Sequence, residues 1–366
     1  MKLLIINTIE FNRNGMSTMI MNYYKHFDHA DIKVDFLINK SIDTVFENEI
    51  LKNKDQVFIF KNRNRFPLQY IKYLRNLAKV YQYDVVYIHG NSATMAAEEF
   101  ALRKLNTKVV VHAHGETTEH QVIHKLLLPY FYKHYDYALA ASIGAGKFLY
   151  GEKNFDVIKN GINAKDFSYT ETGRENFRKK NKINENDLVI LQVGAFTEQK
   201  NHIFTLKLFK KMIGLDNNYK LVLAGDGPLK EHIIKQIKQL GLVSNVCLLG
   251  EISNLQEVYS GSDYLIFPSS WEPFGIVALE GQMAGLPVFL SNKFSKKVAV
   301  TNNCIFLPLN VDIWLERLGS SPKRDRLNDN DNYALAKQLK NSGYDIHDNV
   351  DELVNLLRTI VGEKHE

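Results

Sequence analysis

The chain has 366 residues, a hydrophobic content of 45%, a charged content of 24% and a formal net charge of +5. This length excludes a single compact core and suits two domains, and the composition is typical of a soluble globular protein. The modest positive charge suits an anionic substrate or membrane surface, or a basic surface without a partner, and nothing indicates a nucleic-acid partner.

No apolar run approaches the roughly 20 residues that span a bilayer. The apolar run at residues 3–6 is too short for a signal peptide and predicts a buried first strand. Cys247 and Cys304 lie far apart in sequence, which favours reduced thiols over a disulfide. We therefore expect a cytoplasmic protein.

Short β-rich runs alternate with helical stretches in the first part of the chain, which predicts a parallel α/β sheet. Strands are expected at 2–6, 33–37, 57–60, 84–88 and 108–112, and helices at 16–26, 68–79, 93–105 and 144–149. The polar, charged stretch 169–187 interrupts this alternation and is the expected domain boundary.

The alternation then resumes. Strands are expected at 188–193, 220–223, 246–248, 264–267 and 288–290, and helices at 203–213, 229–240, 276–284 and 350–361, with an exposed loop at 320–332. The sequence thus predicts an α/β protein with two Rossmann-like domains, 1–168 and 169–345, facing each other across a cleft. Residues 346–366 are expected to form a C-terminal helix that packs back towards the N-terminal domain.

Two glutamates, Glu272 and Glu280, lie eight residues apart between an apolar strand and a helix. A helix rises about 1.5 Å per residue, so the carboxylates are expected ~12 Å apart, roughly the span from a sugar to the ribose of a sugar nucleotide. Both can face the groove at the carboxyl ends of parallel strands. This spacing is common in helices, and only the flanking residues make it specific.

The flanks at 268–271 and 281–288 resemble the signature of the retaining family 4 glycosyltransferases. The resemblance covers nearly the whole chain, and the residues at 199–202 and 89–93 are most similar to bacterial capsule and exopolysaccharide enzymes. It implies the GT-B fold, with a nucleotide-sugar donor site in the C-terminal domain, no cofactor and no required metal.

The family's pattern implies three catalytic residues, Glu272, Lys200 and His114. Glu272 would hold the hydroxyls of the transferred sugar, and Glu280 would accept hydrogen bonds from the ribose. Lys200 precedes a helix, where a lysine opposes the dipole, and its place is explained if it binds the diphosphate. Strand-end glycines and a helix N-terminus complete the expected nucleotide-sugar site: Gly15, Gly194, Gly225, Gly227, Gly250, Phe274, Gly275, Ile276 and Val277.

In the N-terminal domain, His114 ends a strand at the place where the family carries a histidine near the reacting sugar. We take His112 and His114 to point to opposite faces of the strand, so that only one faces the groove and the two share no metal. His114 is the expected groove residue, and His112 a core residue. His89 and Asn91 are expected on the acceptor side.

Two positions depart from the family's pattern. Ala195 replaces an arginine of the phosphate loop, and a lost charge-assisted contact costs about 1.5–3 kcal/mol. Gly15 stands alone where the family has a glycine pair. An inactive or weakly active partner subunit therefore stays open as an alternative. The acidic triplet 329–331 lies in a late polar segment, which argues against a metal site.

The stretch 52–79 holds eight basic residues and one acidic residue. Lys61, Arg63 and Arg65 precede Phe66, a pattern that suits an anionic membrane surface or an ordinary solvated helix face. We expect transfer of a hexose or N-acetylhexosamine from a UDP-linked donor to a lipid-linked polysaccharide precursor, at the inner face of the plasma membrane. A UDP-GlcNAc 2-epimerase is the other alternative.

Overall fold

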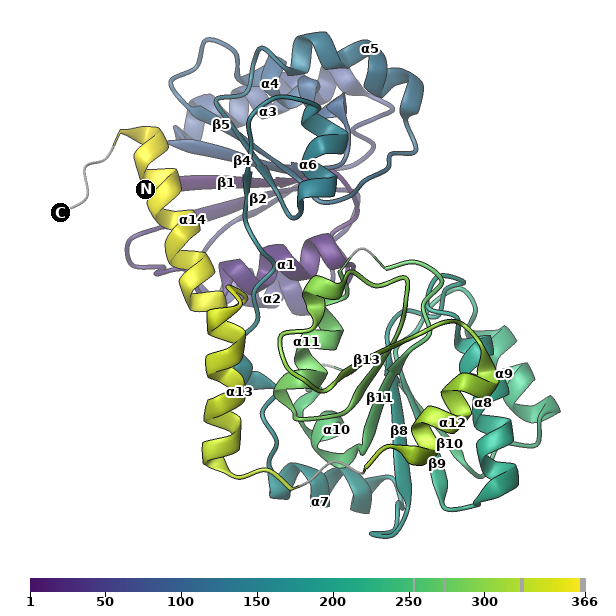
Figure 1. The fold of residues 1–366 in the computed structure, drawn as a ribbon. Coiled ribbons are helices and arrows are strands. Elements are labelled where there is room, and N and C mark those ends of the chain that lie inside the picture. The colour runs from purple at the N-terminus through teal and green to yellow at the C-terminus, as the bar shows by residue number, and fades with distance from the viewer. Residues whose placement is uncertain (253, 273, 323–325, 363–366) are drawn as a thin grey trace. The chain divides into compact units, whose positions relative to one another are not determined.

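The computed structural model describes residues 1–362 apart from 253, 273 and 323–325. The chain forms two compact units, one from Met1–Gly161 with Ile346–Glu366 and the other from Ile162–Asp345 (Figure 1). The chain therefore leaves the first unit at Gly161, before the expected boundary at 168, and returns to it at Ile346.

The first unit is built on a seven-stranded sheet of order β3-β2-β1-β4-β5-β6-β7. Alternate residues of β1 enter different cores, with Leu3 and Ile5 on one face and Leu4 and Ile6 on the other. Both faces are therefore buried, which explains the continuous apolar strands. The parallel strands are β1 (Lys2–Asn7), β2 (Lys33–Asn39), β3 (Val57–Phe60), β4 (Val85–Gly90), β5 (Lys108–Ala113), β6 (Tyr137–Ala140) and β7 (Asp156–Val157).

Helices cover both faces of this sheet. They are α1 (Gly15–Tyr24), α2 (Thr44–Lys52), α3 (Pro67–Tyr81), α4 (Ala96–Leu102), α5 (Gln121–Phe131), α6 (Ile143–Tyr150) and α14 (Ile346–Val361), with a short 3-10 turn at Ala93–Met95. The C-terminal helix α14 buries Val350, Leu353 and Leu357 in the same core as α1 and α2. Its apolar stripe is what returns the end of the chain to the first unit.

The second unit has a six-stranded parallel sheet of order β10-β9-β8-β11-β12-β13. Its strands are β8 (Leu188–Val193), β9 (Tyr219–Ala224), β10 (Val246–Gly250), β11 (Tyr264–Phe267), β12 (Val288–Ser291) and β13 (Cys304–Leu307). Its helices are α7 (Glu171–Lys180), α8 (His202–Leu215), α9 (Lys230–Gln239), α10 (Gln256–Gly261), α11 (Ile276–Met283), α12 (Val311–Ser320) and α13 (Asp329–Asn341). Every strand predicted from the sequence is present, and the prediction of two Rossmann-like parallel α/β domains is confirmed.

Each sheet reverses its strand order once, between β1 and β4 in the first unit and between β8 and β11 in the second. In open parallel sheets, ligands bind beyond the carboxyl ends of the strands at this reversal. The segments that follow β8 and β11 contain Lys200 and Glu272. The topology therefore puts these two predicted residues at the expected ligand edge of the second sheet.

Two polar segments contain helices that the sequence did not predict, one in the expected domain boundary and the other in the expected exposed loop. The stretch 169–187 contains α7, whose Arg174 and Arg178 are buried and pair with Asp263, at 3.3 and 2.7 Å. The segment 320–332 ends in α13, because Asn328 and Asp331 form a capping box there; residues 323–325 lie outside the described part. Among the described residues, no helix combines the length and apolar character needed to cross a bilayer.

Candidate functional site

Three predicted glycines lie next to one another at the carboxyl ends of β8, β9 and β10. The Gly194 N–H donates to the carbonyl oxygen of Ala224 at 2.9 Å, and the Gly225 N–H to that of Gly250 at 2.8 Å. Gly225 has φ +145, and a Cβ there would lie 2.1 Å from the Gly194 carbonyl oxygen. Only glycine therefore allows these two strand ends to come so close.

The turns after β8 and β9 are joined in the same way. The Phe196 N–H donates to the Asp226 carbonyl oxygen at 2.9 Å. A Cβ on Gly227 would lie 2.7 Å from the Phe196 nitrogen. Ala195, in the turn after β8, is exposed. The position that carries an arginine in the family pattern therefore presents only a methyl group to solvent.

The loop that carries Lys200 is anchored to the body of the second unit. Gln192 of β8 donates to the Lys200 carbonyl oxygen at 2.7 Å and accepts from the Thr205 hydroxyl at 2.6 Å. The loop is also tied to the segment after β11, because Asn201 donates to the Pro268 carbonyl oxygen at 3.0 Å and Gln199 to that of Trp271 at 2.8 Å. These bonds fix Lys200 relative to Glu272.

Lys200 and Glu272 form an ion pair between Nζ and Oε2. Their side chains are 19% and 10% exposed. The sequence predicted separate ligands for them, a diphosphate for the lysine and a sugar for the glutamate. The structure brings the two side chains together, so an anion that binds Lys200 has to share or displace its contact with Glu272.

Glu280 lies in α11 and is nearly buried, at 9% exposed. Its Oε2 accepts a hydrogen bond from the Tyr259 hydroxyl at 2.7 Å. Burial raises the pKa of Glu280 to about 7, and the bond from Tyr259 lowers it in part. The sequence missed Tyr259, because no motif marks it and only the packing of α10 against α11 brings it to the carboxyl group.

The N-terminus of α11 depends on a left-handed glycine. Gly275 has φ +82, and a Cβ there would lie 2.4 Å from the Phe294 ring. The Phe274 ring stacks on Tyr344 at 5.0 Å, while Ile276 and Val277 are half-buried in the first turn. The first backbone N–H groups of α11 have no partner within the helix and suit an anion or hydroxyl group.

The raised pKa of Glu280 predicts a pH dependence of nucleotide binding. A ligand whose ribose hydroxyls donate to the carboxylate favours the ionised form and lowers this pKa. If UDP binds with its ribose on Glu280, as the sequence predicts, its affinity should rise as pH increases towards about 7 and level off above it. The rise should be about tenfold for each unit by which binding lowers the pKa of Glu280.

Calorimetry on either side of that pH, in two buffers of different ionisation enthalpy, measures the affinity and the released proton. Without ligand, the raised pKa of Glu280 also contributes to the stability of the fold. This contribution is fully present below the unfolded pKa of about 4.3 and is lost as pH rises to about 7. Glu280→Gln should flatten both profiles. An unchanged pH profile of UDP binding in Glu280→Gln would contradict the ribose assignment.

Three histidines form a cluster in the first unit. His89 of β4 and His112 of β5 are register partners, and His114 follows β5 directly. The ring atoms His89 Nδ1 and His114 Nε2 lie 2.8 Å apart, and the rings of His112 and His114 stack at 4.3 Å. The prediction that His112 and His114 face opposite sides is wrong, because residues two apart in a strand share a face.

Burial keeps this cluster neutral. It lowers the pKa of His114 to about 3 and those of His89 and His112 well below their usual value, with the neighbouring imidazoles adding to the effect at both. Asn91 holds the backbone nearby by accepting the His114 N–H at 2.9 Å. The structure thus brings together His89, Asn91 and His114, all three predicted for this unit.

Gly15 is the predicted residue with the least structural support. It is the first residue of α1, whose N-cap Asn14 accepts the Ser17 N–H. Among the described residues, and apart from its chain neighbours and the backbone of its own helix, no atom lies within 4 Å of the position that a Cβ on Gly15 would take. A side chain would therefore fit here.

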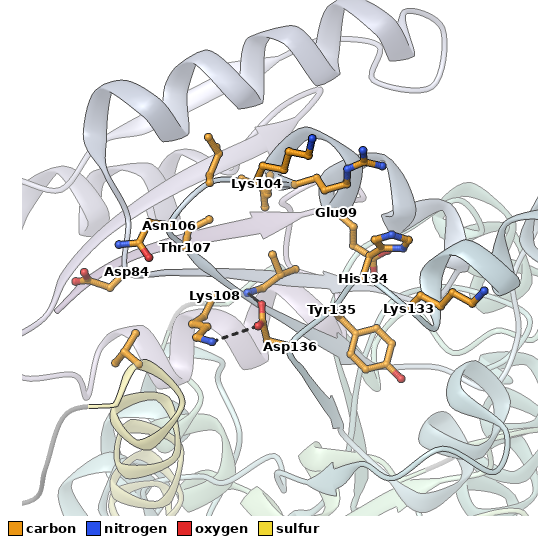
Figure 2. A pocket seen from close by; sticks show the side chains of 15 residues that line it. Asp84, Glu99, Lys104, Asn106, Thr107, Lys108, Lys133, His134, Tyr135 and Asp136 are labelled. Atoms are coloured by element: carbon orange, nitrogen blue, oxygen red, sulfur yellow. Dashed lines mark hydrogen bonds and ion pairs between the residues drawn. The ribbon is translucent and has the colours of Figure 1, made fainter.

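A pocket of about 530 Å³ lies at the opposite edge of the first sheet (Figure 2). Asp84, Lys108 and Asp136, at the amino ends of β4, β5 and β6, line it, and Lys108 pairs with Asp136 at 3.4 Å (Figure 2). None of the predicted site residues lines this pocket. It is therefore separate from the candidate residues at the carboxyl ends of the strands.

Two family models match the chain: Glycosyltransferase Family 4 over residues 13–166 and Glycosyl transferases group 1 over residues 173–306. The putative glycosyltransferase EpsF of Bacillus subtilis is 28% identical over an alignment of 382 positions, gaps included, that covers 97% of this chain and 96% of that protein. The Escherichia coli UDP-Gal:alpha-D-GlcNAc-diphosphoundecaprenol alpha-1,3-galactosyltransferase is 26% identical over 319 residues, 80% of this chain and 79% of that protein.

The fold is also found among solved structures. A glycosyltransferase from Rickettsia africae superposes with a TM-score of 0.79 at 18% identity, and the match covers 99% of each chain. The two family models together cover most of the chain and meet close to the point where it passes from the first unit to the second. The chain therefore belongs to the glycosyltransferases of the GT-B fold, with a family 4 domain followed by a group 1 domain.

Proposed function

We propose that this glycosyltransferase moves a hexose or N-acetylhexosamine, with retention of configuration, from a UDP-linked donor to a lipid-linked precursor of a cell-surface polysaccharide. The observation that carries the proposal is the Lys200–Glu272 pair at the reversal of the second sheet. The N-termini of α8 and α11 follow the same two strands and add backbone N–H groups that favour a diphosphate.

Donor binding would rearrange this pair. The diphosphate takes the ammonium of Lys200, and the freed carboxylate of Glu272 accepts hydrogen bonds from the sugar hydroxyls. Glu280 accepts from the ribose. The glycines at 194, 225, 227 and 250 let the backbone approach the nucleotide, and the first turn of α11 faces the sugar and its leaving phosphate.

In the proposed reaction, the acceptor oxygen bonds to the anomeric carbon on the face from which the diphosphate departs. The bond between that carbon and the phosphate oxygen breaks, and the acceptor proton passes to the leaving phosphate. Lys200 and the helix N-termini stabilise the charge that develops there. The reaction as proposed uses no metal and no other cofactor.

The acceptor side is assigned to the first unit, with His89, Asn91 and His114. The name of the Escherichia coli relative records a UDP-linked donor and a diphosphoundecaprenol acceptor, which supports both assignments. Contact with an anionic inner membrane surface is part of the proposal. Arg63 takes no part in that contact, because its side chain is 5% exposed and pairs with Glu98; exposed Lys61, Arg65 and Leu68 remain.

Thermal unfolding with UDP, UDP-sugars and GDP-sugars tests the donor site. A ligand at 100 times its dissociation constant adds about 2.7 kcal/mol to the free energy of unfolding. We expect UDP and one UDP-sugar to raise the melting temperature. With that UDP-sugar as donor, we expect transfer of the sugar to an undecaprenyl-diphosphate sugar. The absence of any shift with these nucleotides contradicts the donor site, and conversion of UDP-GlcNAc without acceptor would indicate an epimerase.

Ala195 supports a second candidate, a glycosyltransferase-like subunit that binds an active partner. The residue is exposed and offers no cation to a diphosphate. In that case the purified chain turns over no donor, and Ala195→Arg creates no activity. Turnover by the chain alone, increased by Ala195→Arg, would instead support the transferase.

A further inference from the structure

The histidine cluster of the first unit has the composition of a metal site. One ring nitrogen from each of His89, His112 and His114 lies within 4.8 Å of the other two. Two residues are register partners on neighbouring strands, and the third follows on the same face of its strand. We infer that these three histidines bind one zinc-class transition-metal cation.

The free ring nitrogens support this inference. His89 Nε2 and His112 Nε2 are buried and have no hydrogen-bond partner among the described residues. Buried polar nitrogens without partners are rare in native proteins, and an absent ion is one of their explanations. These two ring nitrogens of the cluster can therefore accept a cation.

Tyr87 supplies an outer-sphere contact. Its hydroxyl lies 2.5 Å from His112 Nδ1. A cation on Nε2 leaves the proton on Nδ1, which then donates to the Tyr87 oxygen. Such contacts orient metal-bound imidazoles and raise their basicity. Asn91 fixes the backbone of His114 by accepting its N–H at 2.9 Å.

The donor set selects the kind of cation. Imidazole nitrogen suits zinc, copper, nickel and cobalt, whereas magnesium and calcium require oxygen ligands. Tetrahedral zinc with bonds of about 2.1 Å separates its ligand nitrogens by ~3.4 Å. The separations in the cluster, all within 4.8 Å, therefore close by ring movements on the order of 1 Å. Three protein ligands leave the fourth position for water.

This inference does not rest on the proposed transfer reaction. The cation would lie in the first unit, whereas the diphosphate is assigned to the second. A cation on one nitrogen of His114 leaves the other as an N–H donor, so ligation and contact with a sugar are compatible. The expectation that the histidines share no metal depended on the incorrect prediction that His112 and His114 point to opposite faces of the strand.

Metal analysis of the full chain, purified without a polyhistidine tag and dialysed against zinc, tests the site. We expect one zinc per chain, a raised melting temperature with zinc but not magnesium, and the visible absorption of four-coordinate cobalt after exchange. His112→Ala should lose all three. His202→Ala is the matched control, because His202 is also buried with unpartnered ring nitrogens and lies in the second unit.

A second variant separates ligation from folding. Tyr87→Phe keeps the ring and removes only the hydroxyl, so zinc affinity should fall by about 10–100-fold while the variant still folds without metal. The inference is overturned if the wild-type chain retains no zinc, or if His112→Ala, folded, retains as much zinc as His202→Ala. Equal zinc affinity of Tyr87→Phe and the wild type would also contradict it.

Discussion

Replacement of Lys200 by alanine should lower the rate of sugar transfer by about 10²–10³-fold, the loss typical of removing one group that stabilises developing charge. In the proposed donor site, Ala195 stands where the family pattern has an arginine, so the ammonium of Lys200 would carry more of this task. The change also leaves Glu272, at 10% exposed, without its cation. Steady-state kinetics with saturating acceptor should show the loss in kcat more than in KM.

A matched lysine separates this effect from a general change in charge. Lys211 of α8 pairs with Asp312 on the surface, where the two side chains are 50% and 74% exposed. Such pairs contribute about 0–1 kcal/mol, so Lys211→Ala should keep both stability and activity. If Lys200→Ala has the wild-type kcat and an unchanged affinity for UDP, the assignment of Lys200 to the donor site is wrong.

Glu272→Gln tests the other partner of the pair. The amide keeps the shape and one acceptor oxygen but cannot neutralise Lys200. If the carboxylate serves the sugar, transfer falls while free UDP still binds. If it serves only to hold the lysine, UDP binds more tightly, because the diphosphate no longer competes with a carboxylate. Because Glu272 is paired with Lys200, the transfer rate and the UDP affinity of Glu272→Gln together distinguish these two roles.

The sequence predicted the sheets well, because strands buried on both faces are long runs of apolar, largely β-branched residues. It missed β6 and β13, although they are as long as β3, β11 and β12, which it predicted. It also missed α7 inside a charged stretch, because charge predicts exposure and the arginines of α7 are instead buried against Asp263. Pairing across about 90 residues is not visible in a local pattern.

The candidate site was predicted in its parts but not in its contacts. Glycines after successive strands pointed to one edge of the second sheet, and Gly225 is indeed packed against Gly194. The pairing of Lys200 with Glu272 depends on two loops tied by Asn201 and Gln199, which spacing cannot reveal. The histidine cluster could have been found, because residues two apart in a strand share a face.

Arg63 gives the largest expected effect on stability. Its guanidinium donates from Nε to Glu98 Oε1 at 2.6 Å and from Nη2 to Oε2 at 2.7 Å, and both side chains are almost fully buried. Tyr70 donates to the same carboxylate at 2.8 Å. Arg63→Ala leaves a buried charge unpaired and should lower the free energy of unfolding by about 3–5 kcal/mol, measured by urea denaturation.

The neighbouring arginine is the control. Arg65 is exposed, so Arg65→Ala should change the free energy of unfolding by about 0.5 kcal/mol or less. Binding to anionic vesicles should show the opposite order. Arg65→Ala should weaken this binding, and Arg63→Ala should leave it unchanged. Equal stability of the two variants would contradict the buried pair.

The double variant Arg63→Met with Glu98→Leu decides why Arg63→Ala is destabilising. Buried ion pairs replaced by apolar residues of similar volume are often neutral or stabilising, whereas removal of one partner is not. Recovery of most of the lost stability would show that the unpaired carboxylate causes the loss. Glu99 does not share this cause, because burial and then the charge of Glu98 raise the pKa of Glu99 to about 9. Arg63 thus pairs with one of two adjacent carboxyl groups, whereas burial favours the protonated form of the other, and only the first depends on the arginine.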